Sequence, residues 1–307
     1  MDPDRLTLAA GDARVVVAPG AGGAIASFQW RGEHVLRATG AEALAAGNVR
    51  QHACYPLVPY SNRIANATLL TREGGAFPLA RNFGEHPHAI HGVGWQRAWS
   101  IGAVEPARAS LTLVHRPEGE DRHAWPFAFR AAQSFGLACE PDAAILTFTL
   151  SIENQDTRAF PFGLGWHPYF ARTEATVLGF AAAGVWETER TGLPTRNVPV
   201  PGGWRFDPPR PIAATTLDNA FSGWTGRATL AWPSTRRHAA IEADRACGFL
   251  VVYIPRDGNF VVVEPVTHMT DAFNREALGA SDTGTRWLRP GESHSCSMRI
   301  VATLIAS

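Results

Sequence analysis

The sequence predicts an all-β fold, a sandwich or a barrel, with few short helices. Three observations support this prediction. Apolar and polar residues alternate with a period of two in several segments, as they do in strands that bury one face. The 29 glycines and 22 prolines are spread along the 307 residues and divide the chain into many short elements. Helical spacing of apolar residues is rare, so strands and turns are expected to dominate.

The clearest alternation runs through residues 146–153, which predicts a strand buried on one face. A second strand is expected to begin near Phe127, and a less regular alternation runs from Cys296 to Ala302. In the first of these strands, the apolar face carries Leu146, Phe148, Leu150 and Ile152.

Two further strands are expected to be buried on both faces. Residues 249–254 and 260–263 are short runs of β-branched and aromatic residues, which is typical of the interior of a sheet. Asp257-Gly258-Asn259 lies between the two runs and predicts a hairpin turn. The only helical signals, at 41–46 and 271–278, cover a turn or two each.

No low-complexity linker divides the chain, and no repeat of fixed period is present. The segment 193–211 is rich in proline, but Trp204 and Phe206 within it indicate an ordered loop rather than a tether. Because β domains of this length occur undivided, residues 1–307 are predicted to form one domain.

The charge balance disfavours polyanionic partners. Lysine plus arginine and aspartate plus glutamate both number 28, so the formal net charge is zero. Nucleic-acid binding and binding to an anionic membrane surface both favour a basic face, and neither is predicted here. No run of eighteen apolar residues suggests a membrane-spanning helix.

Cysteine usage and the first residues indicate a cytoplasmic protein. The N-terminal residues are acidic and polar and lack the basic start and apolar run of a signal peptide. No Cys-x-x-Cys pair is present, so a zinc ribbon is not expected. The four cysteines are far apart and are predicted to be buried free thiols, which fits a reducing compartment: Cys54, Cys139, Cys247 and Cys296.

Five clusters of polar residues beside aromatic, glycine or proline residues supply the candidate site. In the first, Asn62 and Arg63 follow two prolines, which disfavour a helix. A guanidinium offers a fixed fork of donors for two neighbouring oxygens, although spacing alone favours a surface arginine that caps a loop carbonyl. In the second, His91 is a candidate donor to a ligand oxygen, but a structural histidine is more common. With His88 it could form a metal pair only if further ligands were present.

The other three clusters contain the candidate acid–base groups. His167 follows a glycine-rich strand end amid four aromatic residues, which suits acid–base work, but a buried histidine with one backbone partner is the alternative. Asp218 is followed by Asn219, which is also an ordinary turn pair. Glu264 ends a β-branched run, where a carboxylate needs partners. A general base and a structural ion pair explain Glu264 equally well, and a metal ligand is a further alternative.

Taken together, the five clusters resemble one family, the aldose 1-epimerases or galactose mutarotases. The matching motifs occur in the family's order and span nearly the whole chain, which makes chance a poor explanation. They are Pro-Leu-Val-Pro-Tyr-Ser-Asn-Arg-Ile at 56–64, His-Gly-Val-Gly-Trp at 91–95, Gly-Trp-His-Pro-Tyr-Phe at 165–170, Leu-Asp-Asn-Ala-Phe at 217–221 and Val-Glu-Pro at 263–265.

The resemblance implies a large antiparallel β-sandwich with its site in an open cleft on one sheet. It also implies that His167 is the general acid and Glu264 the general base. The sugar-binding residues that it implies are Asn62 (in a supporting role), Arg63, His91, Asp218 and Tyr253.

Two segments depart from the family's pattern. Asn219 stands where many members have a second aspartate, one position after the binding aspartate, so it is expected to affect specificity more than chemistry. Residues 81–87 are only loosely similar to the family and are expected to shape the cleft.

The reaction that the resemblance implies interconverts the α and β anomers of a free aldose by opening and closing its ring. Ionised Glu264 and protonated His167 are the expected working form, which gives a bell-shaped pH–rate profile. No metal, nucleotide or redox cofactor is required. The expected partner is a small-molecule sugar.

Two other classes of function stay open. A catalytically inactive sugar-binding or sensing protein could use the same fold, but it would need no opposed acid and base. A hydrolase or lyase with a histidine-rich metal centre is compatible with eleven histidines, but the sequence has no His-Glu-x-x-His or comparable spacing.

Overall fold

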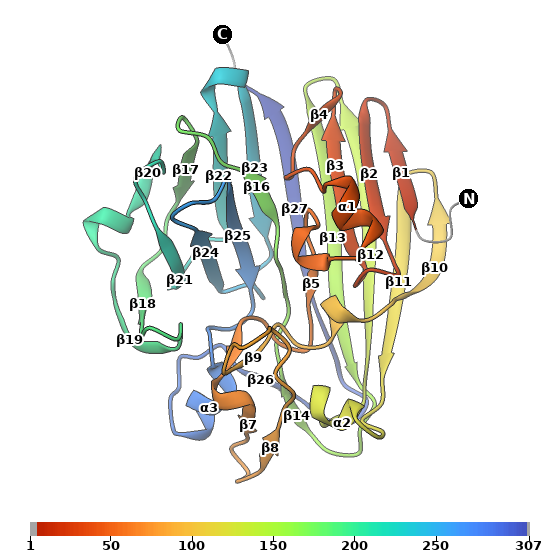
Figure 1. The fold of residues 1–307 in the computed structure, drawn as a ribbon, viewed down its shortest axis with the longest axis vertical. Coiled ribbons are helices and arrows are strands. Elements are labelled where there is room, and N and C mark those ends of the chain that lie inside the picture. Colours follow the sequence, from red (N-terminus) through yellow and green to blue (C-terminus); the bar gives the residue numbers. More distant parts are fainter. Residues whose placement is uncertain (1–4, 306–307) are drawn as a thin grey trace.

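The computed structural model describes residues 5–305 and is built mainly of antiparallel strands in two large sheets (Figure 1). The fold is the β-sandwich that the sequence predicts. The longer sheet contains, in spatial order, β10 (Ser100–Glu105), β11 (Arg108–His115), β12 (Phe129–Glu140), β13 (Ala143–Asn154), β27 (Ser293–Leu304), β23 (Arg237–Ala243), β22 (Arg227–Trp232), β17 (Val177–Phe180) and β20 (Phe206–Pro211).

The second large sheet carries several of the polar clusters identified in the sequence. In spatial order it contains β19 (Pro194–Pro199), β18 (Gly184–Thr188), β21 (Leu217–Ser222), β24 (Phe249–Ile254), β25 (Phe260–Val266), β15 (Gly165–Trp166) and β5 (Pro56–Leu57), with β16 (Tyr169–Ala171) paired to β25. Asp218, Tyr253 and Glu264 lie on three of these strands and His167 follows β15, whereas the other candidate residues lie on smaller elements.

Smaller elements complete the architecture. The N-terminal sheet has the order β1 (Leu6–Ala10), β2 (Ala13–Ala18), β3 (Ala24–Trp30) and β4 (Glu33–His34). Three two-stranded sheets pair β6 (Arg63–Ile64) with β9 (Ala89–Ile90), β7 (Thr68–Leu70) with β8 (Ala76–Pro78), and β14 (Phe160–Phe162) with β26 (Arg286–Leu288). The helices are α1 (Ala41–Ala45), α2 (Asp121–Ala124) and α3 (Ala272–Ala277).

The strand and helix predictions are largely confirmed. The alternating segment lies inside β13, and its predicted apolar face is buried to 1% exposure or less. The two doubly buried runs are β24 and β25, joined by the predicted turn. Helical signals at 41–46 and 271–278 correspond to α1 and α3, whereas the short α2 has no counterpart in the sequence analysis.

Two expectations need correction. Cys139 is only partly buried, because it lies near the end of β12, whereas the other three cysteines are buried free thiols. The proline-rich segment 193–211 is ordered, as expected, but it contains the strands β19 and β20. Each ends its sheet, and an edge strand tolerates proline because one side of its backbone needs no hydrogen-bond partner in the sheet.

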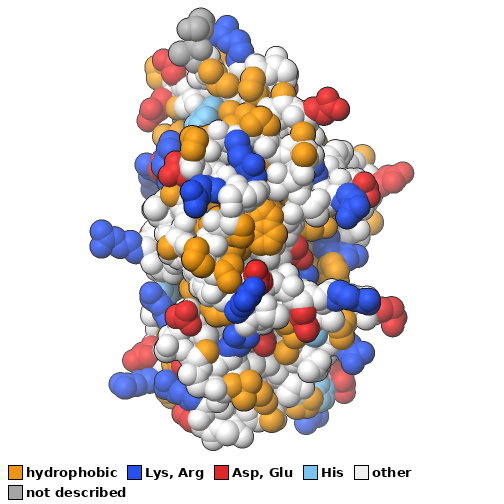
Figure 2. Space-filling model, turned by 90° about the vertical axis from the view of Figure 1, so that its left-hand side faces the viewer, with side chains coloured by type: hydrophobic (Ala, Val, Ile, Leu, Met, Phe, Trp, Pro, Cys, Tyr) orange, Lys and Arg blue, Asp and Glu red, His pale blue; other side chains and the backbone are white. Residues whose placement is uncertain are grey.

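The surface carries both signs of charge. Figure 2 shows acidic and basic side chains interspersed with small apolar patches, without a broad field of one sign on that face. No helix among residues 5–305 is long and apolar enough to cross a lipid bilayer.

Gly163 packs closely against His268, which in turn contacts the backbone next to the candidate site. A Cβ atom added at Gly163 would lie 1.7 Å from Cδ2 of buried His268. The Nε2 atom of His268 accepts a hydrogen bond from the backbone N–H of Ser61 at 3.1 Å, and its Nδ1 faces the carbonyl of Met269 at 2.6 Å. His268 therefore anchors the backbone directly before Asn62.

We expect Gly163→Ala to destabilise the fold by about 1–3 kcal/mol, because the new methyl group must displace His268. Urea unfolding measures the change in free energy. The matched control is Gly136→Ala on β12, where an added Cβ meets no atom within 4 Å and stability should not fall. Equal stability of the two variants would contradict the packing at Gly163.

Candidate active site

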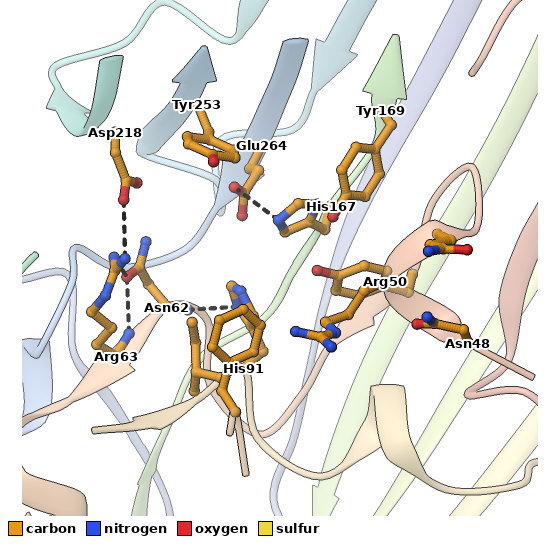
Figure 3. Close-up of a pocket in the computed structure, with 14 residues that line it drawn as sticks. Asn48, Arg50, Asn62, Arg63, His91, His167, Tyr169, Asp218, Tyr253 and Glu264 are labelled. Carbon is orange, nitrogen blue, oxygen red and sulfur yellow. Dashed lines mark hydrogen bonds and ion pairs between the residues drawn. The ribbon is translucent and has the colours of Figure 1, made fainter. Parts of the chain in front are cut away.

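All seven site residues predicted from the sequence line one cavity of about 320 Å³ (Figure 3). This volume is at the lower end of the range for small-molecule sites, roughly 300–1,000 Å³. The same cavity is also lined by seven residues to which the sequence analysis gave no role: Asn48, Arg50, Gln51, Tyr55, Phe83, Ile90 and Tyr169. Tyr55 and Tyr169 lie within or beside the quoted motifs, and Phe83 lies in the segment expected to shape the cleft.

The strand register brings His167 and Glu264 together. The antiparallel ladder pairs Gly165 with Val266 and Tyr169 with Val262, which leaves His167 directly opposite Glu264. Directly opposed residues in such a ladder have Cβ atoms about 4.5–5.5 Å apart. The regular ladder is interrupted around Pro168, which has no N–H to donate.

The two side chains face each other and are almost fully buried. The Nε2 atom of His167 lies 3.5 Å from Oε1 of Glu264, and the residues are 6% and 2% exposed. The His167 ring stacks on Tyr55 with centroids 4.5 Å apart, and Tyr169 lies 4.6 Å away. These rings fix the plane of the imidazole.

Burial moves the pKa values of both groups towards their uncharged forms. It lowers the pKa of His167 to about 3, with a smaller contribution from Arg37. It raises the pKa of Glu264 well above its usual value, and the negative charge of Asp218 adds to this effect. Burial therefore opposes the charged form of each group. The ionised Glu264 and protonated His167 expected in the working form stay a prediction.

The pair has hydrogen-bonding capacity that the protein leaves unused. Among the described residues, neither Oε2 of Glu264 nor Nδ1 of His167 has a hydrogen-bond partner. A buried polar atom without a partner is rare in folded proteins and is costly to keep. The unused carboxyl oxygen belongs to a residue that lines the cavity, where a ligand hydroxyl could meet it.

Arg63 is held in place by an ion pair and an amide. Its guanidinium donates to Oδ2 of Asp218 at 3.0 Å and to Oδ1 of Asn62 at 2.9 Å. Behind it, Gly192 leaves room for the guanidinium, because a Cβ there would lie 2.6 Å from the Arg63 Cζ atom. Arg63 is therefore a ligand-facing side chain and not the loop cap that spacing alone favoured.

His91 and Asn62 are joined by two hydrogen bonds. The N–H of His91 donates to the carbonyl of Asn62 at 2.9 Å, and the N–H of Asn62 donates to Nδ1 of His91 at 3.0 Å. Both residues have left-handed backbone conformations, with φ of 60° and 56°. Burial lowers the pKa of His91 well below its usual value. Because Nδ1 accepts, the proton of the neutral ring is on Nε2, which is available as a donor.

Strand alternation separates Asp218 from its neighbour Asn219. Asp218 lies opposite Tyr253 in the β21–β24 ladder, and both line the cavity. Asn219 does not line it; its amide donates to the carbonyl of Trp186 on β18 at 2.9 Å. The Asn219 side chain therefore ties β21 to β18 and does not contact the cavity, and its expected effect on specificity stays a prediction.

His88 has a structural contact. Its Nδ1 accepts a hydrogen bond from the N–H of Asn66 at 3.0 Å. Within residues 5–305, no group of three or more His, Cys, Asp or Glu side chains is arranged to hold a metal ion.

Proteins of known structure share this sandwich. A candidate aldose 1-epimerase from Escherichia coli K12 matches with a TM-score of 0.86 and 26% identity over 98% of this chain and 99% of that one. Galactose 1-epimerase from Lactobacillus acidophilus NCFM matches with a TM-score of 0.78 and 18% identity, over 98% and 95% of the two chains, which shows a common fold. The fold is that of the galactose mutarotase-like β-sandwich proteins.

Sequence comparison extends this assignment to the family. The family model described as aldose 1-epimerase matches residues 4–301. The uncharacterized protein YphB of Escherichia coli K12 is 30% identical over 287 residues, which cover 91% of this chain and 92% of that protein. The chain belongs to the aldose 1-epimerase family.

The protonation state of the free site can be measured directly. We expect His167 to stay neutral down to about pH 4, because burial lowers its pKa to about 3 and the charged ring forms only below that pH. Nitrogen chemical shifts of labelled histidine, assigned with a His167→Asn variant, report the titration. Protonation of His167 near the ordinary value of about 6.5 would contradict this expectation.

Proposed function

We propose that the protein is an aldose 1-epimerase that interconverts the α and β anomers of an aldose, with His167 and Glu264 as its acid–base pair. The observation that carries this proposal is the opposed, buried pair, 3.5 Å apart, in a cavity that also contains sugar-matched donors and acceptors. Membership of the aldose 1-epimerase family supports it.

The chemistry needs one proton donor and one proton acceptor. Anomers interconvert when the bond between C1 and the ring oxygen breaks. One group removes the proton of the C1 hydroxyl while the other protonates the ring oxygen, and the open-chain aldehyde forms. After rotation about the C1–C2 bond, the ring closes on the other face, and the two groups exchange roles.

A pair that shares one proton suits both halves of this cycle. Sugar binding supplies a hydroxyl to the carboxyl group and a ring oxygen to the imidazole, so the proton can be transferred from Glu264 to His167 in the complex. Ionised Glu264 then acts as the base on the C1 hydroxyl, and protonated His167 acts as the acid on the ring oxygen. Each such group contributes roughly 10²–10⁴-fold to the rate.

Polar groups around the pair match the remaining sugar hydroxyls. Arg63 and Asp218 offer a donor and an acceptor side by side, and neutral His91 offers an Nε2 donor. The ring of Tyr253, which lines the cavity, suits the apolar C–H surface of a sugar. A purely sugar-binding protein could use these ligands, but it would have no need for the buried pair.

We expect Glu264→Gln and His167→Asn each to reduce kcat by about 10²–10⁴-fold, because each removes one partner of the proton exchange. Polarimetry on freshly dissolved α-aldoses, corrected for the buffer rate, measures this loss. The control is Glu187→Gln, which removes a carboxylate outside the cavity and should leave the rate unchanged. Wild-type activity in Glu264→Gln would exclude the assignment. Sugar binding without any acceleration by the wild type would favour the sugar-sensing alternative.

The pH dependence of kcat/KM should be a broad bell. Activity requires the one-proton pair, so it is lost when the pH falls through the pKa of His167, lowered to about 3, and when it rises through the raised pKa of Glu264. We therefore expect full activity at about pH 5, where an ordinary histidine of pKa about 6.5 would already be protonated. An acid limb centred near 6.5 would contradict the effect of burial.

A further inference from the structure

The charged side chains that line the cavity are not all paired. Arg63 is ion-paired with Asp218 at 3.0 Å, and Glu264 lies 3.5 Å from His167. Arg50 also lines the cavity, and it takes part in no ion pair among residues 5–305. Of the arginines and carboxylates that line the cavity, Arg50 is therefore the one without an oppositely charged or imidazole partner among the described residues.

Arg50 enters the cavity from the side away from Arg63 and Asp218. In Figure 3, Asn48 lies on the opposite side of His167 from that ion pair, and the Arg50 side chain extends from the same side to below His167. The Arg50 guanidinium is 4.7 Å from the centre of the Phe83 ring, which positions it at the rim without neutralising it.

A second arginine reinforces the positive potential at this end. Arg37 lies 3.8 Å from the centre of the Tyr169 ring and donates to the backbone carbonyls of Arg50 and His52 at 3.2 and 3.1 Å. Within the described part of the chain it has no carboxylate partner either. The positive charge of Arg37 reaches the reacting pair, since it contributes to the lowered pKa of His167.

The segment that carries Arg50 also supplies spare amide donors. Asn48, Arg50 and Gln51 lie in or beside the short turn Val49–Gln51 after α1, and all three side chains line the cavity. No side-chain hydrogen bond of these three is present among residues 5–305, although Asn48 and Arg50 accept through their carbonyls. Uncommitted donors around an unpaired guanidinium match an oxyanion, because guanidinium binds carboxylate and phosphate through paired hydrogen bonds.

We propose, building on the epimerase function above, that the substrate is an acidic aldose, whose carboxylate or phosphate group is bound by Arg50, Asn48 and Gln51. In this arrangement C1 lies at His167 and Glu264, and the anionic group is directed to the end of the cavity away from Arg63 and Asp218. A neutral aldose fits the catalytic pair but leaves the donors at the Arg50 end without an anion.

The test compares matched sugars that differ only at C6. Mutarotation of glucose, glucuronate and glucose 6-phosphate, and of the three galactose counterparts, is followed by NMR and corrected for each buffer rate. We expect kcat/KM for one acidic form to exceed that for its neutral counterpart by about tenfold or more at low ionic strength. Added salt should reduce this preference, because the anion and the exposed Arg50 are screened. The uronate and phosphate arms distinguish the two kinds of anion.

Variants assign the preference to Arg50. Arg50→Gln should reduce the acidic-to-neutral ratio of kcat/KM about 10- to 100-fold, and Arg50→Lys should restore part of it. The matched control is Arg72→Gln, which removes another arginine that stacks on an aromatic ring, Trp287, but lies outside the cavity; the ratio should not change.

The outcomes separate the two proposals. Acceleration of neutral sugars with no acidic preference, or an unchanged ratio in Arg50→Gln, overturns the acidic-substrate inference and leaves the epimerase proposal standing. Failure to accelerate any sugar overturns the epimerase proposal itself. An acidic preference that is lost in Arg50→Gln and partly restored in Arg50→Lys supports both.

Discussion

The mutual burial of His167 and Glu264 is the constraint on which the rest of the site depends. An isolated carboxylate in an apolar sheet costs several kcal/mol, so it persists only with a partner or a shared proton. The partner comes from the neighbouring strands, because the β15–β25 and β16–β25 ladders have one common register. A slip of one residue would turn Glu264 to the other face of the sheet and destroy the pair. Strand register is therefore the property that makes acid–base chemistry available here.

The loops around the pair are fixed by backbone contacts more than by side chains. His91 and Asn62 exchange two hydrogen bonds in left-handed conformations, and Gly92 packs so closely that a Cβ would lie 2.4 Å from the carbonyl of Val58. Asp271 holds the same segment from the other side by accepting from the N–H of Ala65 and donating to the carbonyl of Arg63. Such strained but well-supported backbone is typical of functional sites, where ligand-facing groups must not move.

Local patterns in the sequence predicted the strands, the turn after β24 and two of the three helices, because alternation and glycine spacing are local properties. The candidate residues were likewise visible as clusters. That these residues meet in one cavity was not visible from local patterns, because it depends on pairing between strands about a hundred residues apart. Only the family resemblance indicated it. The direction in which burial moves both pKa values was not predicted either, because burial of both partners cannot be read from neighbouring residues. Arg50 was not predicted from the sequence, because it lies in an exposed turn outside every motif. Only the fold places it beside the cavity.

Two kinds of structure form the walls of the cavity. The large sheet supplies His167, Glu264 and Asp218, whose positions are set by strand ladders, and Arg63 reaches Asp218 from the small β6–β9 sheet. The turn at 48–51 and the segment containing Phe83 supply the other wall, where few contacts restrain the side chains. In the proposed complex, electrostatic attraction at this wall acts on the part of the sugar remote from C1, so it adds binding energy away from the proton exchange. The unpaired Arg50 therefore lies on the side of the cavity that no long ladder fixes.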